Sequence, residues 1–355
     1  APHRGRRQRL LRLAGEPRAA GLDENPAGVR AELESPRDVS HGSTVSSDLA
    51  KVQRRRLPGK GDRAGRPAGP AGRTAATYLA RFRRLIVVLD DRHSRARWIP
   101  ASHNCPGFPF GVAGNALLAR YRAHAQEYGA PITQTRVKTL LRRDAVFVAN
   151  DGQREWRAPH VILATGVVDR VPDMANVEDA IHRGVMRLCA VCDGYEARDE
   201  VIGVLAPAAV VLDHAEYLRT FSRRVVALMM DRSGAVDSAW RERAVCIGIA
   251  VYPAPMRLSL SDKGCRADFA HGEPLYLDTL YPVLGADVQS GLARTLGARF
   301  NDVGELHVDK RMHTSVDGLY AIGDVVSGLN QISVAVGHAA IAASAVHQRL
   351  PPNPC

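Results

Sequence analysis

The chain reads GPAGRTAATYLARFRRLIVVLD from Gly69 to Asp90, and this stretch decides the fold class. Glycine and proline open it as a turn, and residues 74–82 have the spacing of apolar side chains that is typical of a helix. Residues 85–89 are an unbroken apolar run, as in a buried strand. A turn, a helix and a strand in this order predict the second half of a βαβ unit.

The same pattern recurs along the chain. Strands are expected near 136–141, 145–148 and 161–164, a helix over 115–128, and a second strand, helix and strand at 201–205, 211–220 and 225–229. An alanine-rich helix over 333–350 is expected to end at Pro351 and Pro352, because proline cannot continue a helix. The sequence therefore predicts an α/β protein with two Rossmann-like, dinucleotide-binding domains.

Length and composition agree with a two-domain protein. The chain has 355 residues, of which 45% are hydrophobic and 24% charged, which is typical of a soluble protein. Its apolar runs are shorter than the roughly 18 residues that a membrane span needs, and the N-terminus does not resemble a secretory signal. We expect a cytoplasmic protein that does not bind membranes.

The net charge of +11 is concentrated at the N-terminus. Residues 1–68 contain 15 Lys and Arg and 8 Asp and Glu, and they lack helical or strand periodicity. We expect residues 1–66 to be a basic, disordered leader. Because it has no aromatic residues for base stacking, we do not expect it to bind nucleic acid. The abrupt change of residue composition at Gly69 suggests an altered reading frame or a misplaced start upstream. Residues 60–66 have one apolar side chain and therefore do not fit a buried central strand.

The turn at Gly69-Pro-Ala-Gly72 fits a phosphate-binding site. Backbone N–H groups at a helix start face outward, and the helix dipole favours negative charge there. Asp90 follows Gly69 by 21 residues, the spacing of the carboxylate that holds an adenosine ribose in dinucleotide-binding folds. The first glycine of the usual fingerprint falls on Pro67, so an ordinary turn before a helix remains an alternative.

Cys189-Ala-Val-Cys192 is the most specific local motif. Two intervening residues allow the thiols to meet and form a reversible disulfide, and Asp193 beside them can manage protons during thiol–disulfide exchange. A zinc site would need two further ligands at suitable spacing, so we expect no metal. Inert cysteines are the remaining alternative. Cys105 stands alone and is expected to serve packing.

Four motifs together resemble the low-molecular-weight thioredoxin reductase family and occur in that family's order. They are Gly69-Pro-Ala-Gly72, Leu163-Ala-Thr-Gly166, Cys189-Ala-Val-Cys-Asp-Gly-Tyr-Glu196 and Thr314-Ser-Val-Asp-Gly-Leu-Tyr-Ala-Ile-Gly-Asp324. The resemblance implies an FAD domain over 67–170 and 276–355, interrupted by an NAD(P)-binding-like domain over 171–275 that carries the cysteine pair. It also implies a homodimer.

The resemblance further implies roles for individual residues. Cys192 would face the flavin, Cys189 would attack the substrate, and Asp193 would act as acid and base. The residues expected to bind FAD are Gly69, Pro70, Ala71, Gly72, Asp90, Asn104, Thr165, Gly166, Gly323, Asp324 and Gln331. Electrons would pass from NADPH or NADH through FAD and the disulfide to a thioredoxin-like protein or a small-molecule disulfide.

The second unit departs from the family pattern. The glycines of its nucleotide fingerprint fall on Ala206, Ala208 and Val211, and a side chain at the middle position would crowd a pyrophosphate. This favours, as an alternative, a flavin-dependent dithiol oxidase that passes electrons to O₂ without a nicotinamide. A degenerate, non-catalytic family member is the third alternative.

Overall fold

The computed structural model describes residues 69–230, 236–326 and 328–353, and these form a mixed α/β fold. The expected leader and the question of a first strand before Gly69 fall outside the described residues. None of the described helices has the length and apolar character needed to cross a membrane.

The first segment, up to residue 169, holds three helical elements and seven strands. They are α1 (Pro70–Arg81), β1 (Val88–Asp90), η1 (Arg95–Trp98), α2 (Gly114–Glu127), β2 (Ile132–Gln134), β3 (Thr139–Arg143), β4 (Val146–Asn150), β5 (Glu155–Ala158), β6 (Val161–Leu163) and β7 (Val167–Asp169). The chain returns to this part through β15 (Ala286–Val288), α7 (Gly291–Arg294), β16 (Leu319–Ala321), η2 (Gly323–Val325) and α8 (Ile332–Arg349).

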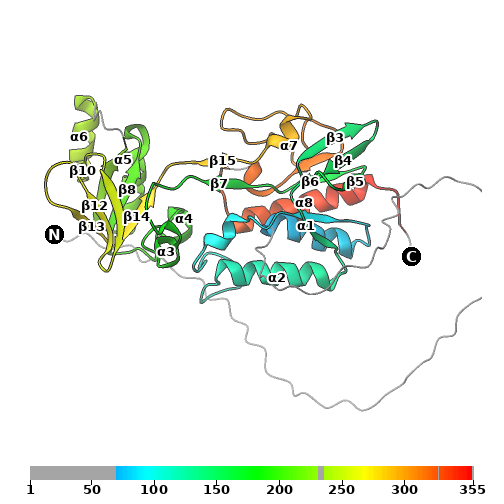
Figure 1. Cartoon of the computed structure of the whole chain (residues 1–355), viewed down its shortest axis with the longest axis horizontal. Helices are drawn as coiled ribbons and strands as arrows, with labels where there is room; N and C mark the ends of the chain where they lie inside the picture. The colour runs from blue at the N-terminus through cyan, green and yellow to red at the C-terminus, as the bar shows by residue number, and fades with distance from the viewer. Residues whose placement is uncertain (1–68, 231–235, 327, 354–355) are drawn as a thin grey trace, which may run out of the picture. The chain divides into compact units, whose positions relative to one another are not determined.

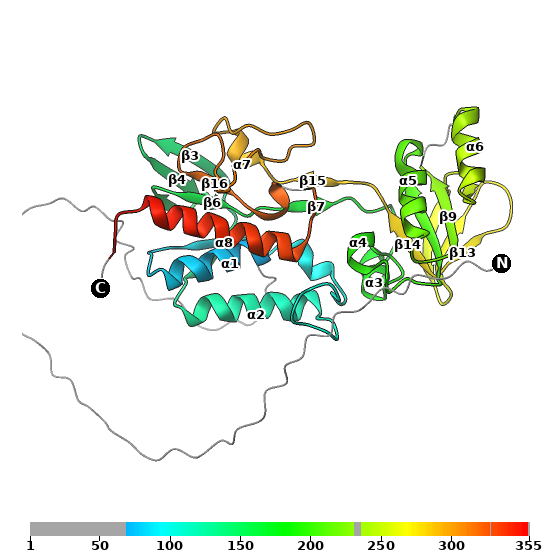
Figure 2. The same ribbon diagram turned by 180° about the vertical axis from the view of Figure 1, so that it is seen from behind.

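Helix α1 confirms the expected helix after the glycine turn. Gly69 caps it in an extended conformation and Pro70 occupies the first turn, where its missing N–H costs no hydrogen bond. The small apolar residues of α1, such as Ala71 and Ala75, pack against α8, while Ala76 packs towards α2. Both ribbon views show α1 between α8 and α2 (Figures 1 and 2).

The expected buried strand at 85–89 is only partly correct. The strand begins at Val88, and Leu85 is 87% exposed. Strand β1 pairs in parallel with β2, and β16 pairs in parallel with β6, as two separate two-stranded sheets. Among the described residues, β1 pairs with β2 alone. Its paired and buried part is therefore shorter than the apolar run 85–89 suggests.

The segment after residue 170 contains the second βαβ unit. Its elements are α3 (Val177–His182), α4 (Ala190–Asp193), β8 (Val201–Ala206), α5 (Ala208–Leu218), β9 (Arg224–Met229), α6 (Ser238–Cys246), β10 (Ala250–Tyr252), β11 (Arg257–Ser261), β12 (Gly264–Asp268), β13 (Leu275–Leu277) and β14 (Thr279–Pro282). Strands β8 and β9 run parallel on either side of α5 in sequence, as expected.

The sheet of this unit has the strand order β10-β9-β8-β14. Central β8 is apolar and almost entirely buried, as a parallel strand covered on both faces must be. Pairing of β14 with β8 carries this sheet past residue 275, where we expected the FAD-domain segment to resume. The apolar run that forms β14 would suit either sheet, so its partner could not be read from the sequence.

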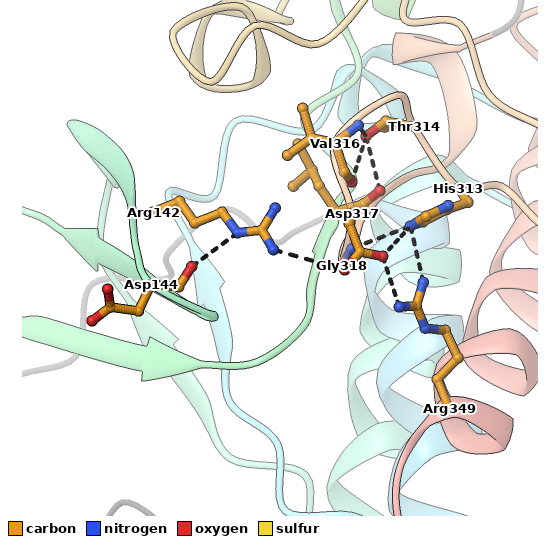
Figure 3. A network of polar contacts seen from close by, with 9 residues as sticks. Arg142, Asp144, His313, Thr314, Val316, Asp317, Gly318 and Arg349 are labelled. Carbon is orange, nitrogen blue, oxygen red and sulfur yellow. Dashed lines mark hydrogen bonds and ion pairs between the residues drawn. The ribbon is translucent and has the colours of Figure 1, made fainter.

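A polar network fixes the turn that precedes β16 (Figure 3). Asp317 lies 2.7 Å from Arg349 in the last turn of α8 and 3.7 Å from Arg142 on β3. The backbone N–H of Gly318 donates to His313 Nε2 at 3.1 Å. The motif from Thr314 to Asp324 is thus held between α8 and β3, which positions the glycine at 323 beside α1.

Candidate active site

Cys189 and Cys192 form a disulfide, as the spacing predicts. Cys189 caps the short helix α4, and the backbone N–H groups of Cys192 and Asp193 both donate to the carbonyl oxygen of Cys189. Both cysteines are half-buried. Cys105 is a free thiol packed against Val112 and Leu117, so its expected packing role is confirmed.

A chain of side-chain amides leads to the two sulfurs. Gln331, at the start of α8, points its Nε2 at Cys192 Sγ at 3.3 Å and at Cys189 Sγ at 3.5 Å. Its Oε1 accepts a hydrogen bond from Asn104 Nδ2 at 2.9 Å, and Ser102 donates to Asn104. Asn104 and Gln331, both expected near the flavin, therefore meet each other, and Gln331 also meets the disulfide.

Asp193 has a half-buried carboxyl in the same turn as the sulfurs. Burial raises the pKa of Asp193 to about 6, and the opposing effects of Arg187 and Tyr281 are smaller. Arg187 Nη1 lies 3.8 Å from Asp193 Oδ2, and the Tyr281 hydroxyl lies 3.0 Å from Oδ1. A carboxyl with a pKa near neutrality can both give and take a proton under physiological conditions.

The start of α1 has the features that a dinucleotide pyrophosphate needs. A Cβ on Gly72 would touch Ala164 Cβ at 3.4 Å, so helix and strand end approach closely. Two buried polar atoms, Thr74 Oγ1 in α1 and Asn330 Oδ1 just before α8, have no hydrogen-bond partner among the described residues. Buried polar atoms are normally paired, so each of these two atoms, one in α1 and one just before α8, fits contact with a polar ligand. The residues present therefore fit FAD.

The two expected FAD-binding carboxylates are both engaged by arginines. Asp90 is buried at the end of β1, where Oδ2 pairs with Arg73 Nη2 at 3.2 Å and Oδ1 accepts from the N–H of Arg92 at 2.7 Å. Asp324 pairs with Arg95 at 3.3 Å. Burial raises the pKa of Asp324, an effect that Arg95 opposes.

Thr165 and Gly166, which we expect to mark the crossover, lie between β6 and β7. Gly166 has a φ of +64°, and its carbonyl oxygen accepts from the N–H of Gln289 after β15. This hydrogen bond joins the segment that leads to the cysteine pair with the segment that returns after residue 285. Within the described ranges, no cluster of three or more His, Cys, Asp or Glu residues is arranged to hold a metal ion.

The family model for pyridine nucleotide-disulphide oxidoreductases matches residues 68–339, which is most of the chain. The chain belongs to this family. As a pyridine nucleotide-disulphide oxidoreductase, it is a thioredoxin reductase-like, FAD-dependent enzyme, and the cofactors of the family are FAD and NAD(P)H. The expected fold class, with two Rossmann-type domains, is confirmed.

Curated relatives and solved structures agree with this assignment. The chain is 28% identical to the thioredoxin reductase of Treponema pallidum over 290 residues, covering 78% of this chain and 93% of the relative. It is 27% identical to the thioredoxin reductase of Mycolicibacterium smegmatis over 288 residues, covering 78% and 92%. The crystal structure of HlmI matches with a TM-score of 0.72 and 26% identity, covering 82% of this chain and 94% of HlmI.

The second nucleotide turn, between β8 and α5, contains no glycine. Ala206 ends β8 fully buried, Pro207 caps α5, and Val211 is fully buried in the core. At positions where a nucleotide fingerprint places glycine for close backbone approach, this oxidoreductase has side chains. Residues 231–235, which follow β9, lie outside the described residues.

Sequence reasoning missed several residues of the site. Tyr281, Arg187, Arg95 and Arg73 all contact expected site residues, yet none belongs to a short motif. An arginine at position 73, inside an otherwise small and apolar helix face, was the one signal available, since a buried arginine requires an anionic partner. Tyr281 comes from a strand whose pairing the sequence did not reveal.

Gly323 provides a test of the expected FAD site. Its φ is +73°, and a Cβ there would lie 3.1 Å from Ala71 Cβ in α1. We expect Gly323→Ala to lower the free energy of unfolding by about 1–3 kcal/mol, because an alanine is strained at this φ. The variant should also retain less FAD after purification, measured by absorbance of the released flavin.

Gly272→Ala is the matched control. Gly272 also has a positive φ, of +92°, but a Cβ there would meet nothing within 4 Å. It should carry similar backbone strain and keep its FAD. Equal loss of flavin from both variants would show that general destabilisation, and not the contact with α1, controls binding.

Proposed function

We propose that this enzyme transfers electrons from NAD(P)H through FAD and the Cys189–Cys192 pair to a disulfide substrate. The observation that carries the proposal is the contact between Gln331 and both sulfurs, because Gln331 caps α8 and directly follows Asn330, which has an unpartnered buried oxygen. The disulfide thus adjoins the residues that fit the flavin. When bound, FAD accepts two electrons from the nicotinamide and supplies them to the disulfide.

Within this proposal the two cysteines have different roles. Cys192 is the flavin-facing sulfur and Cys189 is the interchange thiol, as the resemblance to the low-molecular-weight thioredoxin reductases implies. The cofactor-binding residues are those around α1, β1, the crossover and the start of α8: Gly69, Pro70, Ala71, Gly72, Asp90, Asn104, Thr165, Gly166, Gly323, Asp324 and Gln331.

The substrate reaction then follows thiol–disulfide exchange. The Cys189 thiolate attacks one sulfur of the substrate, which forms a mixed disulfide and releases the other sulfur as a thiolate. Protonated Asp193 gives its proton to that leaving thiolate. The Asp193 carboxylate then takes the proton from the Cys192 thiol, whose sulfur attacks Cys189, re-forms the protein disulfide and releases the second substrate thiolate, which is protonated by solvent. Two electrons have moved from the protein to the substrate.

The proposed substrate is a thioredoxin-like protein, as the names of the relatives suggest, or a small-molecule disulfide. Two exposed side chains support an apolar contact surface beside the pair: Val191, between the cysteines, is 53% exposed, and Tyr195 is 65% exposed. We also propose that the enzyme is a homodimer and acts in the cytoplasm.

A second candidate is a dithiol oxidase, favoured by the side chains at Ala206, Ala208 and Val211. In that reaction a substrate dithiol would reduce the Cys189–Cys192 disulfide, and the two electrons would pass by way of FAD to O₂, which becomes hydrogen peroxide. No nicotinamide is then required.

Anaerobic reduction separates the two candidates. Purified enzyme with its FAD quantified is mixed without oxygen with NADPH, with NADH or with dithiothreitol, and flavin absorbance is followed. We expect a pyridine nucleotide to bleach the flavin and the reduced enzyme to reduce a thioredoxin disulfide. Bleaching by the dithiol alone, with hydrogen peroxide formed on admission of air, would replace the reductase by the oxidase. Absence of FAD after reconstitution would leave the non-catalytic alternative.

A further inference from the structure

Tyr281 reaches the Asp193 carboxyl from a strand of the neighbouring sheet. Its hydroxyl oxygen lies 3.0 Å from Asp193 Oδ1 and 3.2 Å from the main-chain carbonyl oxygen of the same residue. The tyrosine is 2% exposed and lies on β14, which is paired with β8. Its ring packs in the core with residues such as Val204 and Ala206, so the hydroxyl has a fixed position.

Four charged or titratable side chains act on Asp193. Arg187 Nη1 lies 3.8 Å from Oδ2 and also 3.4 Å from the main-chain oxygen, and it favours the carboxylate. Tyr281 favours the carboxylate too, whereas Glu196 and Glu200 disfavour it. Tyr281 and Arg187 therefore hold the two carboxylate oxygens separately, one each, and both also contact the main chain at the end of α4.

We propose that Tyr281 is the positioning residue of the proton donor, holding the Asp193 carboxyl and the end of α4 in register with the two sulfurs. This rests on the proposed role of Asp193 in thiol–disulfide exchange. Tyr281 is not part of any sequence motif, and its role follows from one hydroxyl whose single proton lies within hydrogen-bond distance of both the carboxyl and the main-chain oxygen of Asp193.

The chemistry of the hydroxyl suits this role. Burial raises the pKa of Tyr281 well above its ordinary value, so the hydroxyl remains a neutral donor throughout the working range. A donor to a carboxyl oxygen stabilises the carboxylate more than the neutral acid. Tyr281 therefore opposes the effect of burial, which alone would keep the pKa of Asp193 higher still. Without it, the acid would give up its proton less readily.

The test removes only the hydroxyl. In Tyr281→Phe the ring keeps its packing, and the midpoint at which Asp193 ionises should move upward by about one pH unit, the size expected for one hydrogen bond to a charged group. Infrared difference spectroscopy across pH 4–9 reads this midpoint from the carboxyl C=O band of the oxidised enzyme. Asp193→Asn identifies the band by its loss.

Tyr217→Phe is the matched control. Tyr217 lies on α5 of the same unit, is 44% exposed and makes an edge contact with Phe221. Removing the hydroxyl of Tyr217 should leave the midpoint of Asp193 ionisation unchanged. In parallel, the descending limb of the pH–rate profile for thioredoxin disulfide reduction should shift upward in Tyr281→Phe by the same amount as the infrared midpoint, and not in the control.

The outcomes distinguish the two proposals. An unchanged infrared midpoint in Tyr281→Phe, in a variant that unfolds like the wild type, overturns the role of Tyr281 whatever the activity. A shifted midpoint in an enzyme that reduces no disulfide supports the role of Tyr281 in holding the carboxyl and counts against the proposed function alone. A shift in both the midpoint and the rate profile supports both.

Discussion

Cys192→Ser is expected to abolish disulfide reduction while leaving the flavin reducible by NAD(P)H. Serine has nearly the same size, but its hydroxyl is not a nucleophile at neutral pH and cannot form a disulfide with Cys189. Because the two thiols act as a unit, turnover should fall by about a thousandfold or more. Steady-state reduction of a thioredoxin disulfide measures the loss, and anaerobic bleaching measures the step that should survive.

Cys246→Ser is the control for this result, since Cys246 is a free and exposed thiol on α6. It should retain full activity. If Cys192→Ser still turned over at more than a few per cent of the wild-type rate, electrons would have to leave the flavin by another route, and the pair would not be the redox centre.

The Asp193→Asn variant should turn over more slowly than the wild type but have a higher free energy of unfolding. Loss of the proton donor is expected to reduce turnover by roughly 10²–10⁴-fold, the usual contribution of general acid–base catalysis. Burial raises the pKa of Asp193 to about 6, so the folded protein binds this proton more tightly than the unfolded chain does. The resulting stabilisation is complete below about pH 4 and is lost as the pH rises through about 6.

Above pH 7 the wild-type protein therefore carries a half-buried charge that the amide variant does not have. A shift of about two pKa units corresponds to about 3 kcal/mol, so Asp193→Asn should be more stable than the wild type by up to that amount at pH 8 and by little at pH 4. Urea unfolding at both pH values measures the difference. A variant that is less stable at pH 8 would mean that the pairing of Asp193 with Arg187 outweighs the cost of burial.

Much of the fold was readable because its signals are local. The helix after Gly69, the βαβ unit from β8 to β9 and the long helix α8 each have the apolar spacing of the element they form. The errors concern long-range pairing. Residues 85–87 look like a strand, but a strand needs a neighbour, and β1 pairs only from Val88. For the same reason, the sequence could not show that β14 joins β8.

The redox pair was predictable and its surroundings were not. Cys189, Cys192 and Asp193 lie within one turn, so their spacing in sequence almost fixes their spacing in space. Tyr281 is separated from Asp193 by 88 residues and meets it only because two strands pair. Arg95 likewise meets Asp324 across 229 residues. Partners that lie this far apart in sequence can be identified only once the tertiary structure is known.

The pairing of β7 with β15 brings together the two ends of the segment that carries the cysteine pair. Asp169 on the outgoing strand lies opposite Ala286 on the returning one, so the whole segment that carries the cysteine pair leaves and re-enters at facing residues. To the rest of the chain, this segment is equivalent to the loop of a β-hairpin. A two-residue Asn-Gly turn placed between Arg170 and Gly285, which already form a backbone hydrogen bond, could replace residues 171–284 without altering the register of the ribbon. The excised piece, with its ends already adjacent, is suited to insertion into another protein as a transferable dithiol module.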